Sequence, residues 1–332
     1  MAMAVVLAAC GKDDKATTAD SGGAAKPSTE PVVNLTLGGA HGTAHLAPVE
    51  IGIETGKYKA CNIEVKFATF GGGGEILRAV TTGAVDLAAV ATNAAIGAYA
   101  KATPLSVVAG AFQTSNRVIY IVKKDSPYKT VSDLSGHKVG ITSPGSVSEI
   151  LIKYALTRSN VALNKVQFVP VGQIPAGVAA LESGAIDTTL LAYPDAATFD
   201  KNKFRVLLDA DKFLKEHDQA FQQTVFASTA SWSKDHADVA KRFANCTKGV
   251  YDYVKANVSE ATATYARIAK VDPAAAKEVI EYHVANKGWT VNVNRKGVEF
   301  ALASLKEQKA VPDTYSMKDL EPMFAASAVL TD

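Results

Sequence analysis

The sequence carries almost no net charge, and this low charge argues against a nucleic-acid-binding function. It has 35 Lys and Arg residues against 33 Asp and Glu residues, which leaves a formal net charge of +2. It also has no run of basic residues and no RNA-binding signature. Because nucleic-acid-binding proteins concentrate positive charge on one surface, we expect no nucleic-acid partner.

Long hydrophobic runs and catalytic motifs are missing as well. After residue 10 no apolar run approaches the roughly 20 residues that a membrane-spanning helix needs. The glycine run Gly71–Gly74 is not followed by Lys and Ser or Thr, which excludes a P-loop for nucleotide phosphates. No Ser-His-Asp order, Cys-His pair or facing pair of carboxylates stands at the predicted strand ends. We therefore predict a protein that is not an enzyme and needs no cofactor.

Histidine is too scarce and too scattered for a metal site. Only His41 and His45 are close in the sequence, at a spacing that would share one helix face. Zinc needs three or four ligands, and the remaining histidines stand far apart, at His137, His217, His236 and His283. We expect no metal site and interpret His41 as a hydrogen-bonding residue.

The three cysteines bear on cellular location and on stability. The run Leu7-Ala8-Ala9-Cys10 resembles a bacterial lipoprotein processing site, in which Cys10 becomes the lipidated first residue. No Lys or Arg precedes it, so either the true start lies upstream or a disordered N-terminus carries a chance cysteine. We expect the first case: residues 1–31 are then a signal remnant and a flexible tether, and a lipid anchor holds the protein to a membrane outside the cytoplasm. Cys61 and Cys246 form a disulfide or remain two buried thiols.

One eight-residue pattern occurs twice in the chain. Residues 79–86 and 180–187 both read as a helix end, a glycine, a short turn and an aspartate, and a run of small or apolar residues follows each. A glycine after a helix supplies the left-handed cap, and an unbroken apolar run is typical of a strand buried on both faces. The pattern therefore predicts two similar α/β lobes with mixed, mostly parallel sheets flanked by helices.

The two lobes are expected to form a clamp. In open α/β sheets a ligand lies outside the carboxyl ends of the strands, so two facing lobes place those ends on opposite walls of one cleft. We predict lobe 1 from residues 32–114 with 226–332, and lobe 2 from residues 115–225. Two crossings, 111–116 and 224–228, join them, and the helices after Ser233 return to lobe 1.

Several motifs resemble a known family. They are residues 48–58, Phe70–Gly74, residues 84–88 and the pattern Asp133-Leu134-x-Gly136-x-x-Val139-Gly140. Together with the repeat, they resemble the type II periplasmic substrate-binding proteins of ABC importers, in the branch that binds nitrate, taurine, aliphatic sulfonates and thiamin-pyrimidine precursors.

The resemblance implies a monomer that delivers a small-molecule ligand to an ABC permease and its ATPase. The alternative is an enzyme or sensor on the same fold that acts on a heteroaromatic such as a pyrimidine. The pyrimidine-synthase branch carries a Cys-Cys-Cys-Phe-Cys run that this chain lacks, which counts against the enzyme.

The candidate ligand-binding residues stand at the predicted strand ends. Glycine amides there can reach a ligand at a helix start, and aromatic rings can stack on a ring or cover alkyl groups, although each ring can also belong to a core. On lobe 1 we expect His41, Gly42, Thr43, Phe70, Gly72, Gly73, Thr92, Asn93, Phe112 and Phe226. On lobe 2 we expect Ser143, Gly145, Ser146, Gln173, Tyr193 and Asp195.

Charged residues near these turns favour one kind of ligand. Ser146 and Glu149 fit a capping box, and Glu149 and Glu75 add negative charge at two helix starts. A small, highly charged anion is therefore less favoured than an organic ligand with polar edges, such as a sulfonate, a carboxylate or a heteroaromatic. Arg117 could pair with an acidic group of the ligand or form a salt bridge within the protein.

Overall fold

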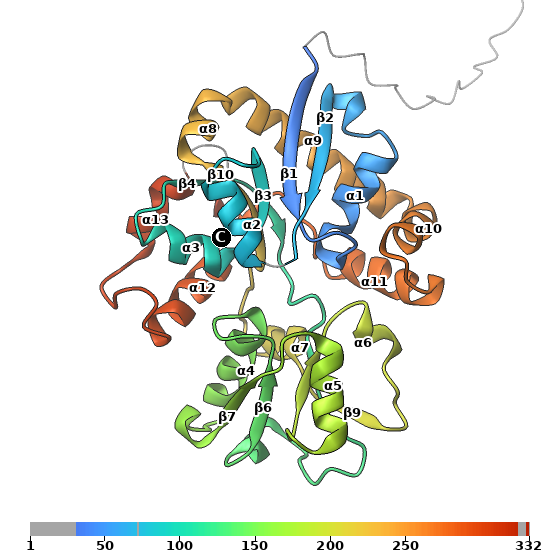
Figure 1. The fold of residues 1–332 in the computed structure, drawn as a ribbon, viewed down its shortest axis with the longest axis vertical. Coiled ribbons are helices and arrows are strands. Elements are labelled where there is room, and N and C mark those ends of the chain that lie inside the picture. Colours follow the sequence, from blue (N-terminus) through green and yellow to red (C-terminus); the bar gives the residue numbers. More distant parts are fainter. Residues whose placement is uncertain (1–30, 72, 325–329, 332) are drawn as a thin grey trace, which may run out of the picture.

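The chain folds into two α/β lobes stacked along the long axis of the molecule (Figure 1). The computed structural model describes residues 31–71, 73–324, 330 and 331. The chain builds most of the sheet of lobe 1, crosses to lobe 2, and returns to lobe 1 for its remaining strand and helices (Figure 1). This arrangement confirms the predicted fold class. Among the helices described, none is both long and apolar enough to span a bilayer.

Lobe 1 is built on a five-stranded sheet with the strand order β2-β1-β3-β10-β4. Strands β1, β2 and β3 are parallel, with Leu37 paired to both Phe67 and Leu87, whereas β10 runs antiparallel to β3 and β4. The parallel strands therefore all end at the same edge of the sheet. The five strands are β1 (Val33–Gly39), β2 (Ile63–Thr69), β3 (Leu87–Ala91), β4 (Leu105–Phe112) and β10 (Thr224–Thr229).

Helices cover both faces of this sheet, and each face has its own apolar core. One face packs against α2 (Gly73–Thr81), α3 (Thr92–Tyr99), α12 (Arg295–Glu307) and α13 (Met317–Phe324). The other packs against η1 (Ala44–Leu46), α1 (Ala47–Glu54), η2 (Lys59–Cys61), α8 (Ala230–Asp235) and α9 (Ala237–Ala256). On α9 the residues Val239, Phe243, Cys246, Val250 and Val254 recur at helical spacing and are all buried.

The C-terminal part of the chain extends lobe 1. Helix α10 (Val258–Ala269) packs on α1, and α11 (Pro273–Ala285) packs on α10. A two-stranded pair, β11 (Val293–Asn294) and β12 (Leu330–Thr331), interrupts the helices that the sequence predicts after Ser233.

Lobe 2 is smaller and combines two short sheets. One has the order β8-β5-β9 and is antiparallel; the other pairs β6 and β7 in parallel, and a parallel bridge from Val139 to Thr188 joins them. The strands are β5 (Ile119–Lys123), β6 (Lys138–Ile141), β7 (Gln167–Pro170), β8 (Thr189–Leu191) and β9 (Phe204–Asp209). The helices are η3 (Val131–Leu134), α4 (Val147–Arg158), η4 (Leu163–Lys165), α5 (Ile174–Ser183), α6 (Asp195–Thr198) and α7 (Ala210–Glu216).

The sequence repeat has the same structure in both lobes. Gly83 and Gly184 have φ values of 72° and 79°, the left-handed conformation that glycine adopts most easily. Asp86 then accepts the backbone N–H of Thr36 at 2.7 Å, and Asp187 accepts that of Lys138 at 2.8 Å. Each aspartate thus precedes one strand and bonds to the neighbouring parallel strand. This shared role explains why the pattern is present twice.

Both crossings lie a few residues away from the positions predicted from the sequence. The first crossing is residues 113–118, because Ala111 and Phe112 still belong to β4. The second is residues 217–223. The interpretation of 224–228 as a crossing is wrong, since these residues form β10, which is hydrogen-bonded to β3 on one side and to β4 on the other. The buried run Val225–Ala227 explains this, because such a run favours a central strand.

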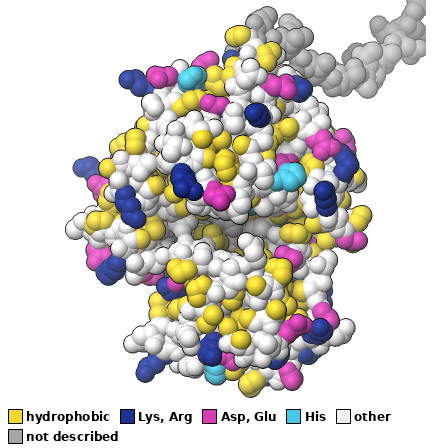
Figure 2. Space-filling view, viewed as in Figure 1, with side chains coloured by type: hydrophobic (Ala, Val, Ile, Leu, Met, Phe, Trp, Pro, Cys, Tyr) yellow, Lys and Arg dark blue, Asp and Glu magenta, His cyan; other side chains and the backbone are white. Residues whose placement is uncertain are grey.

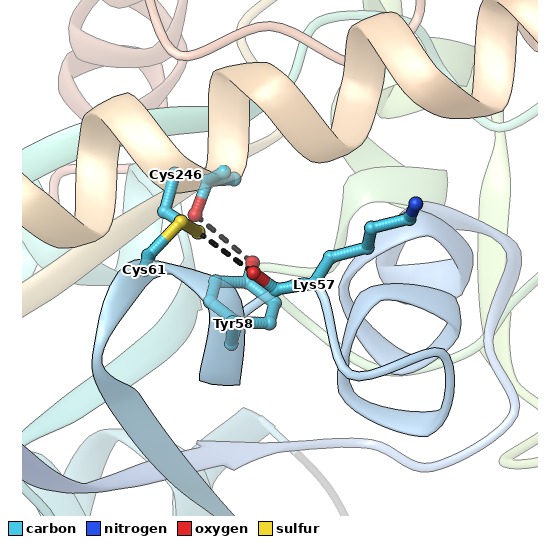
Figure 3. Close-up of a disulfide and its surroundings, with 5 residues drawn as sticks. Lys57, Tyr58, Cys61 and Cys246 are labelled. Carbon is cyan, nitrogen blue, oxygen red and sulfur yellow. Dashed lines mark hydrogen bonds between the residues drawn. A yellow bond between two sulfur atoms is a disulfide. The ribbon is translucent and has the colours of Figure 1, made fainter. Parts of the chain in front are cut away.

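A disulfide joins Cys61 and Cys246, which resolves the alternative left open by the sequence (Figure 3). It connects η2, just before β2, to α9 across 185 residues of chain. Next to it, the Tyr58 hydroxyl lies 2.9 Å from Thr247 Oγ1, and the Tyr58 ring stacks on Phe243. The disulfide therefore fixes the edge of the lobe 1 sheet to the longest helix of that lobe.

Removing this disulfide should destabilise lobe 1. The double variant Cys61→Ala/Cys246→Ala should lose about 2–5 kcal/mol of unfolding free energy, because the unfolded chain is no longer constrained by so long a loop. Urea denaturation followed by circular dichroism measures the change, and reductant-treated wild-type protein should show the same loss. An unchanged midpoint in both samples would contradict the structural role of the bond.

Candidate functional site

The candidate site is the cleft between the two lobes, where a hollow is visible across the molecule (Figure 2). In lobe 1 the parallel strands β1, β2 and β3 end at Gly39, Thr69 and Ala91. In lobe 2 the parallel strands β6 and β7 end at Ile141 and Pro170, and β8 ends beside them at Leu191. The turns after these strands form the two edges that face each other.

A direct hydrogen bond shows that the two edges meet. Asn93 Nδ2, in the first turn of α3, donates to the backbone oxygen of Gly145, in the loop between β6 and α4, at 2.9 Å. Thr92 is only 1% exposed, and its backbone N–H donates to the oxygen of Gln223 in the second crossing. Its hydroxyl has no hydrogen-bond partner among the described residues. The structure thus brings Thr92, Asn93 and Gly145 together.

The loop after β1 is shaped by a buried glutamate. The Gly42 N–H donates to Glu50 Oε1 at 2.9 Å, and His41 Nδ1 lies 2.7 Å from Glu50 Oε2. Burial raises the pKa of Glu50, and the bonds from Gly42 and His41 oppose that rise. The Thr43 hydroxyl donates to the oxygen of Ala40 rather than capping a helix. His41 itself is 53% exposed at the lobe edge.

The starts of α2 and α4 follow one pattern. The Gly71 N–H donates to Glu75 Oε2 at 2.9 Å, and the Gly145 N–H donates to Glu149 Oε2 at 2.6 Å. Ser146 caps α4 by accepting the N–H of Glu149, so the predicted cap is confirmed, although the glutamate reaches back to Gly145 instead of Ser146. Gly73 begins α2 with open space around it, and the predicted residue Gly72 lies outside the described residues.

The other predicted residues of lobe 2 occupy the same edge. Ser143 and Gln173 are exposed in the turns after β6 and β7, and Gln173 precedes α5 without capping it through its side chain. Asp195 is exposed in the first turn of α6.

On lobe 1, the predicted residue Phe70 is half-buried after β2 and packs on the core beneath α2.

Two predicted wall residues are corrected by the structure. Phe112 and Phe226 are 0% exposed, so neither ring lines the cleft. Both lie in neighbouring strands of the lobe 1 sheet, where Phe226 packs edge-on against Phe243 and Phe112 packs against His283. The sequence marked these rings because they stood beside the expected crossings, whereas the chain crosses only after β4 and before β10.

Tyr193 belongs to a cluster that connects the lobes next to the first crossing. Its hydroxyl donates to Glu278 Oε1 on α11 at 2.9 Å and accepts from Arg117 Nη1 at 3.0 Å. The Arg117 guanidinium also lies 5.0 Å from the Tyr282 ring centroid and 3.4 Å from Asp209 Oδ2. We call Arg117, Tyr193, Glu278 and Tyr282 the hinge cluster. These contacts hold Arg117 within the protein, in line with the salt-bridge alternative.

Sequence reasoning missed most of the partners in this region. Glu278 and Tyr282 come from a helix some 85 residues after Tyr193, and no local signal indicates their approach. Asn116 holds Tyr193 in place by accepting its N–H and donating to its oxygen, and Asn116 Oδ1 lies 3.1 Å from His283 Nε2. Burial lowers the pKa of His283 to about 3, so the ring stays neutral.

Two other hollows lie away from the cleft edges. One of about 450 Å³ is beside the crossings and is lined by Gln113, Asp211 and Gln219, among others. The other, of about 650 Å³, lies over the disulfide and α9. None of the predicted ligand-binding residues lines either hollow, so we place the candidate site at the facing strand ends.

The hinge cluster predicts a specific effect of removing one hydroxyl. Tyr193→Phe keeps the ring but deletes the bonds to Glu278 and Arg117, and should lower the unfolding free energy by about 1–3 kcal/mol. Tyr154→Phe is the matched control, because the Tyr154 hydroxyl is buried without a described partner and its loss should cost little. Chemical denaturation measures both variants, and equal stability of the two would contradict the role of the cluster.

Comparison with known proteins gives three kinds of match. A family model described as NMT1/THI5 like matches residues 43–261. A putative aliphatic sulfonates-binding protein of Escherichia coli (strain K12) is 30% identical over 148 residues, which are 44% of this chain and 46% of that protein. The chain thus matches slightly less than half the length of this curated relative.

Solved structures show the fold. The periplasmic aliphatic sulphonate binding protein SsuA from Escherichia coli aligns with a TM-score of 0.70 at 19% identity, covering 91% of this chain and 95% of that one. The alkanesulfonate-binding protein SsuA from Xanthomonas axonopodis pv. citri, bound to MOPS, gives 0.69 at 15% identity, covering 90% and 99%. The desulfurization enzyme DSZB gives 0.63 at 13% identity, covering 88% and 96%.

These matches confirm the resemblance found in the sequence. The fold is that of periplasmic binding proteins, and the family match extends across both lobes, from the loop after β1 to α10. Because the family model covers about two thirds of the chain, the protein belongs to the NMT1/THI5-like family.

Proposed function

We propose that the protein is an extracytoplasmic solute-binding protein, which captures a small organic molecule between its lobes and delivers it to an ABC import permease. The observation that carries this proposal is the hydrogen bond from Asn93 to Gly145, which joins the strand-end edges of the two lobes. Membership in the NMT1/THI5-like family and the sulfonate-binding relatives support it. A sulfonate, a carboxylate or a heteroaromatic is the class of ligand we consider.

Closure of the lobes is the mechanism that this geometry supports. Two crossings join the lobes, and contacts between them lie on both sides of the cleft: Asn93 with Gly145, the hinge cluster, and Phe300 of α12 against Tyr154 of α4. A ligand that touches both edges binds the closed form more tightly than the open form. That difference in affinity alone drives closure.

Location and partners follow from the same proposal. A disulfide forms and persists in oxidising compartments, which supports a place outside the cytoplasm. The lipid anchor on Cys10 remains a proposal based on the sequence, because residues 1–30 lie outside the described part of the chain. The closed monomer would present its outer surface to the permease, and the ATPase subunit would supply the energy.

An enzyme on the same fold is the second candidate. The likeness to the desulfurization enzyme DSZB favours it, since that enzyme shares the fold at a TM-score of 0.63. Against it, the cleft edges, as far as the structure describes them, hold no nucleophile activated by a neighbouring base. A turnover measurement separates the two functions.

Ligand binding without turnover is the expected behaviour. In a thermal-shift screen of sulfonates, aromatic acids, pyrimidines and amines, at least one compound should raise the melting temperature and be recovered unchanged by mass spectrometry. Asn93→Ala should weaken binding of that compound about fivefold, because closure loses one hydrogen bond of about 1 kcal/mol. The exposed variant Asn202→Ala should not. Conversion of the compound to a product would contradict the proposal and favour the enzyme.

A further inference from the structure

Three glycine amides at the cleft edges are each occupied by a glutamate of the protein itself. The Gly42 N–H donates to Glu50, the Gly71 N–H to Glu75 and the Gly145 N–H to Glu149, at distances of 2.9, 2.9 and 2.6 Å. Glu75 and Glu149 stand on the helices that follow their glycines, α2 and α4, and Glu50 stands on α1, which follows η1. Two loops of lobe 1 and one loop of lobe 2 therefore share one arrangement.

This arrangement changes what the helix starts can bind. Free amides at the start of a helix attract an anion, because the N–H groups and the helix dipole both favour negative charge. Here a carboxylate already accepts one of these amides in each loop. An incoming anion would have to displace that carboxylate or lie beside it, at an electrostatic cost.

The cleft turns also carry no cation of their own, and the cations near them in the described part of the chain are already paired with carboxylates. The turns 40–43, 70–74, 92–93, 143–147, 172–173 and 193–195 contain no Lys or Arg. Two cations contact these turns or their glutamates, and both are paired. Lys153 lies 2.7 Å from Glu149 Oε1, and Arg117 is held by Asp209 and the hinge cluster.

Polar side chains that can donate or accept a hydrogen bond are present at the same edges. The Thr92 hydroxyl is the most informative, because its side chain is buried beside Asn93 and its oxygen has no partner within the described part of the chain. A buried hydroxyl without a partner is costly, so a ligand group that bonds to it would be favoured. The exposed side chains of Ser143 and Gln173 can donate and accept, whereas the exposed Asp195 carboxylate only accepts.

We propose that the cleft takes an uncharged or cationic organic molecule, and that Glu75 and Glu149 exclude sulfonates and carboxylates. The proposal rests on the proposed function and narrows its ligand class. It also separates this chain from relatives whose names specify sulfonates.

The decisive experiment removes the two carboxylate charges and measures binding of hexane-1-sulfonate by calorimetry. Wild-type protein should bind this probe with a dissociation constant above about 1 mM. Glu75→Gln/Glu149→Gln should bind it at least tenfold more tightly, because glutamine keeps an acceptor for each amide but carries no charge. Glu75→Gln alone, at an exposed position, gives a second variant with little risk to folding and should show part of the gain.

The control is Glu307→Gln/Glu321→Gln, which changes the net charge equally at exposed positions on α12 and α13. It should leave sulfonate binding unchanged. Micromolar binding of hexane-1-sulfonate by the wild type would overturn the proposal, and so would a charge-neutralised variant that gains nothing over the control.

A second measurement distinguishes this proposal from the proposed function. Small-angle scattering of the wild type is recorded with hexane-1-sulfonate and, separately, with the uncharged and cationic compounds of the screen. Compaction with the sulfonate would support closure of the lobes on a ligand but would overturn the proposed ligand class. Compaction with an uncharged or cationic compound alone supports both. No compaction with any compound would overturn the clamp and the ligand class together.

Discussion

Parallel strands that share a sheet must end at the same edge, and the whole cleft depends on this constraint. In lobe 1 it gathers the turns after β1, β2 and β3, and in lobe 2 those after β6, β7 and β8. Asp86 and Asp187 help to hold the neighbouring strands in this arrangement, since each accepts an N–H from the adjacent parallel strand. The two crossings then turn the edges toward each other, and Asn93 reaches Gly145.

Most charged side chains at the resulting site are already bonded to other groups of the protein. Glu50, Glu75 and Glu149 use amides that an anionic ligand would otherwise bind, and Arg117 is paired inside the hinge cluster. The remaining polar groups are hydroxyls, amides, the His41 imidazole and the exposed carboxyl of Asp195. A fold shared with sulfonate-binding proteins therefore does not by itself determine the ligand, because charge at the strand ends is set by individual side chains.

Much of this architecture could be predicted from local patterns in the sequence. The repeat around Gly83 and Gly184 predicted two similar lobes, because a left-handed cap and a buried strand both leave signals within ten residues. Asn93 and Gly145 were both placed at the ends of predicted strands, Asn93 after the first copy of the repeat and Gly145 after the strand predicted at residues 137–141. Their facing one another was inferred from the rule for strand ends, and the hydrogen bond between them agrees with it.

What the sequence did not predict depends on contacts between distant segments. Phe112 and Phe226 were placed at the cleft because the crossings were set a few residues too far into β4 and β10, and only strand pairing reveals those bounds. The partners of Tyr193 come from α11, and the choice between a disulfide and two thiols depended on the approach of η2 to α9. No local pattern carries such information.

The most direct test of the account is the distance between the lobes in solution. Spin labels at Lys101→Cys on lobe 1 and Lys129→Cys on lobe 2, both exposed, report it in a Cys10→Ser background. With a saturating amount of a ligand found by thermal shift, the distance distribution should become shorter and narrower. An identical distribution with and without that ligand would contradict a clamp that closes on its ligand.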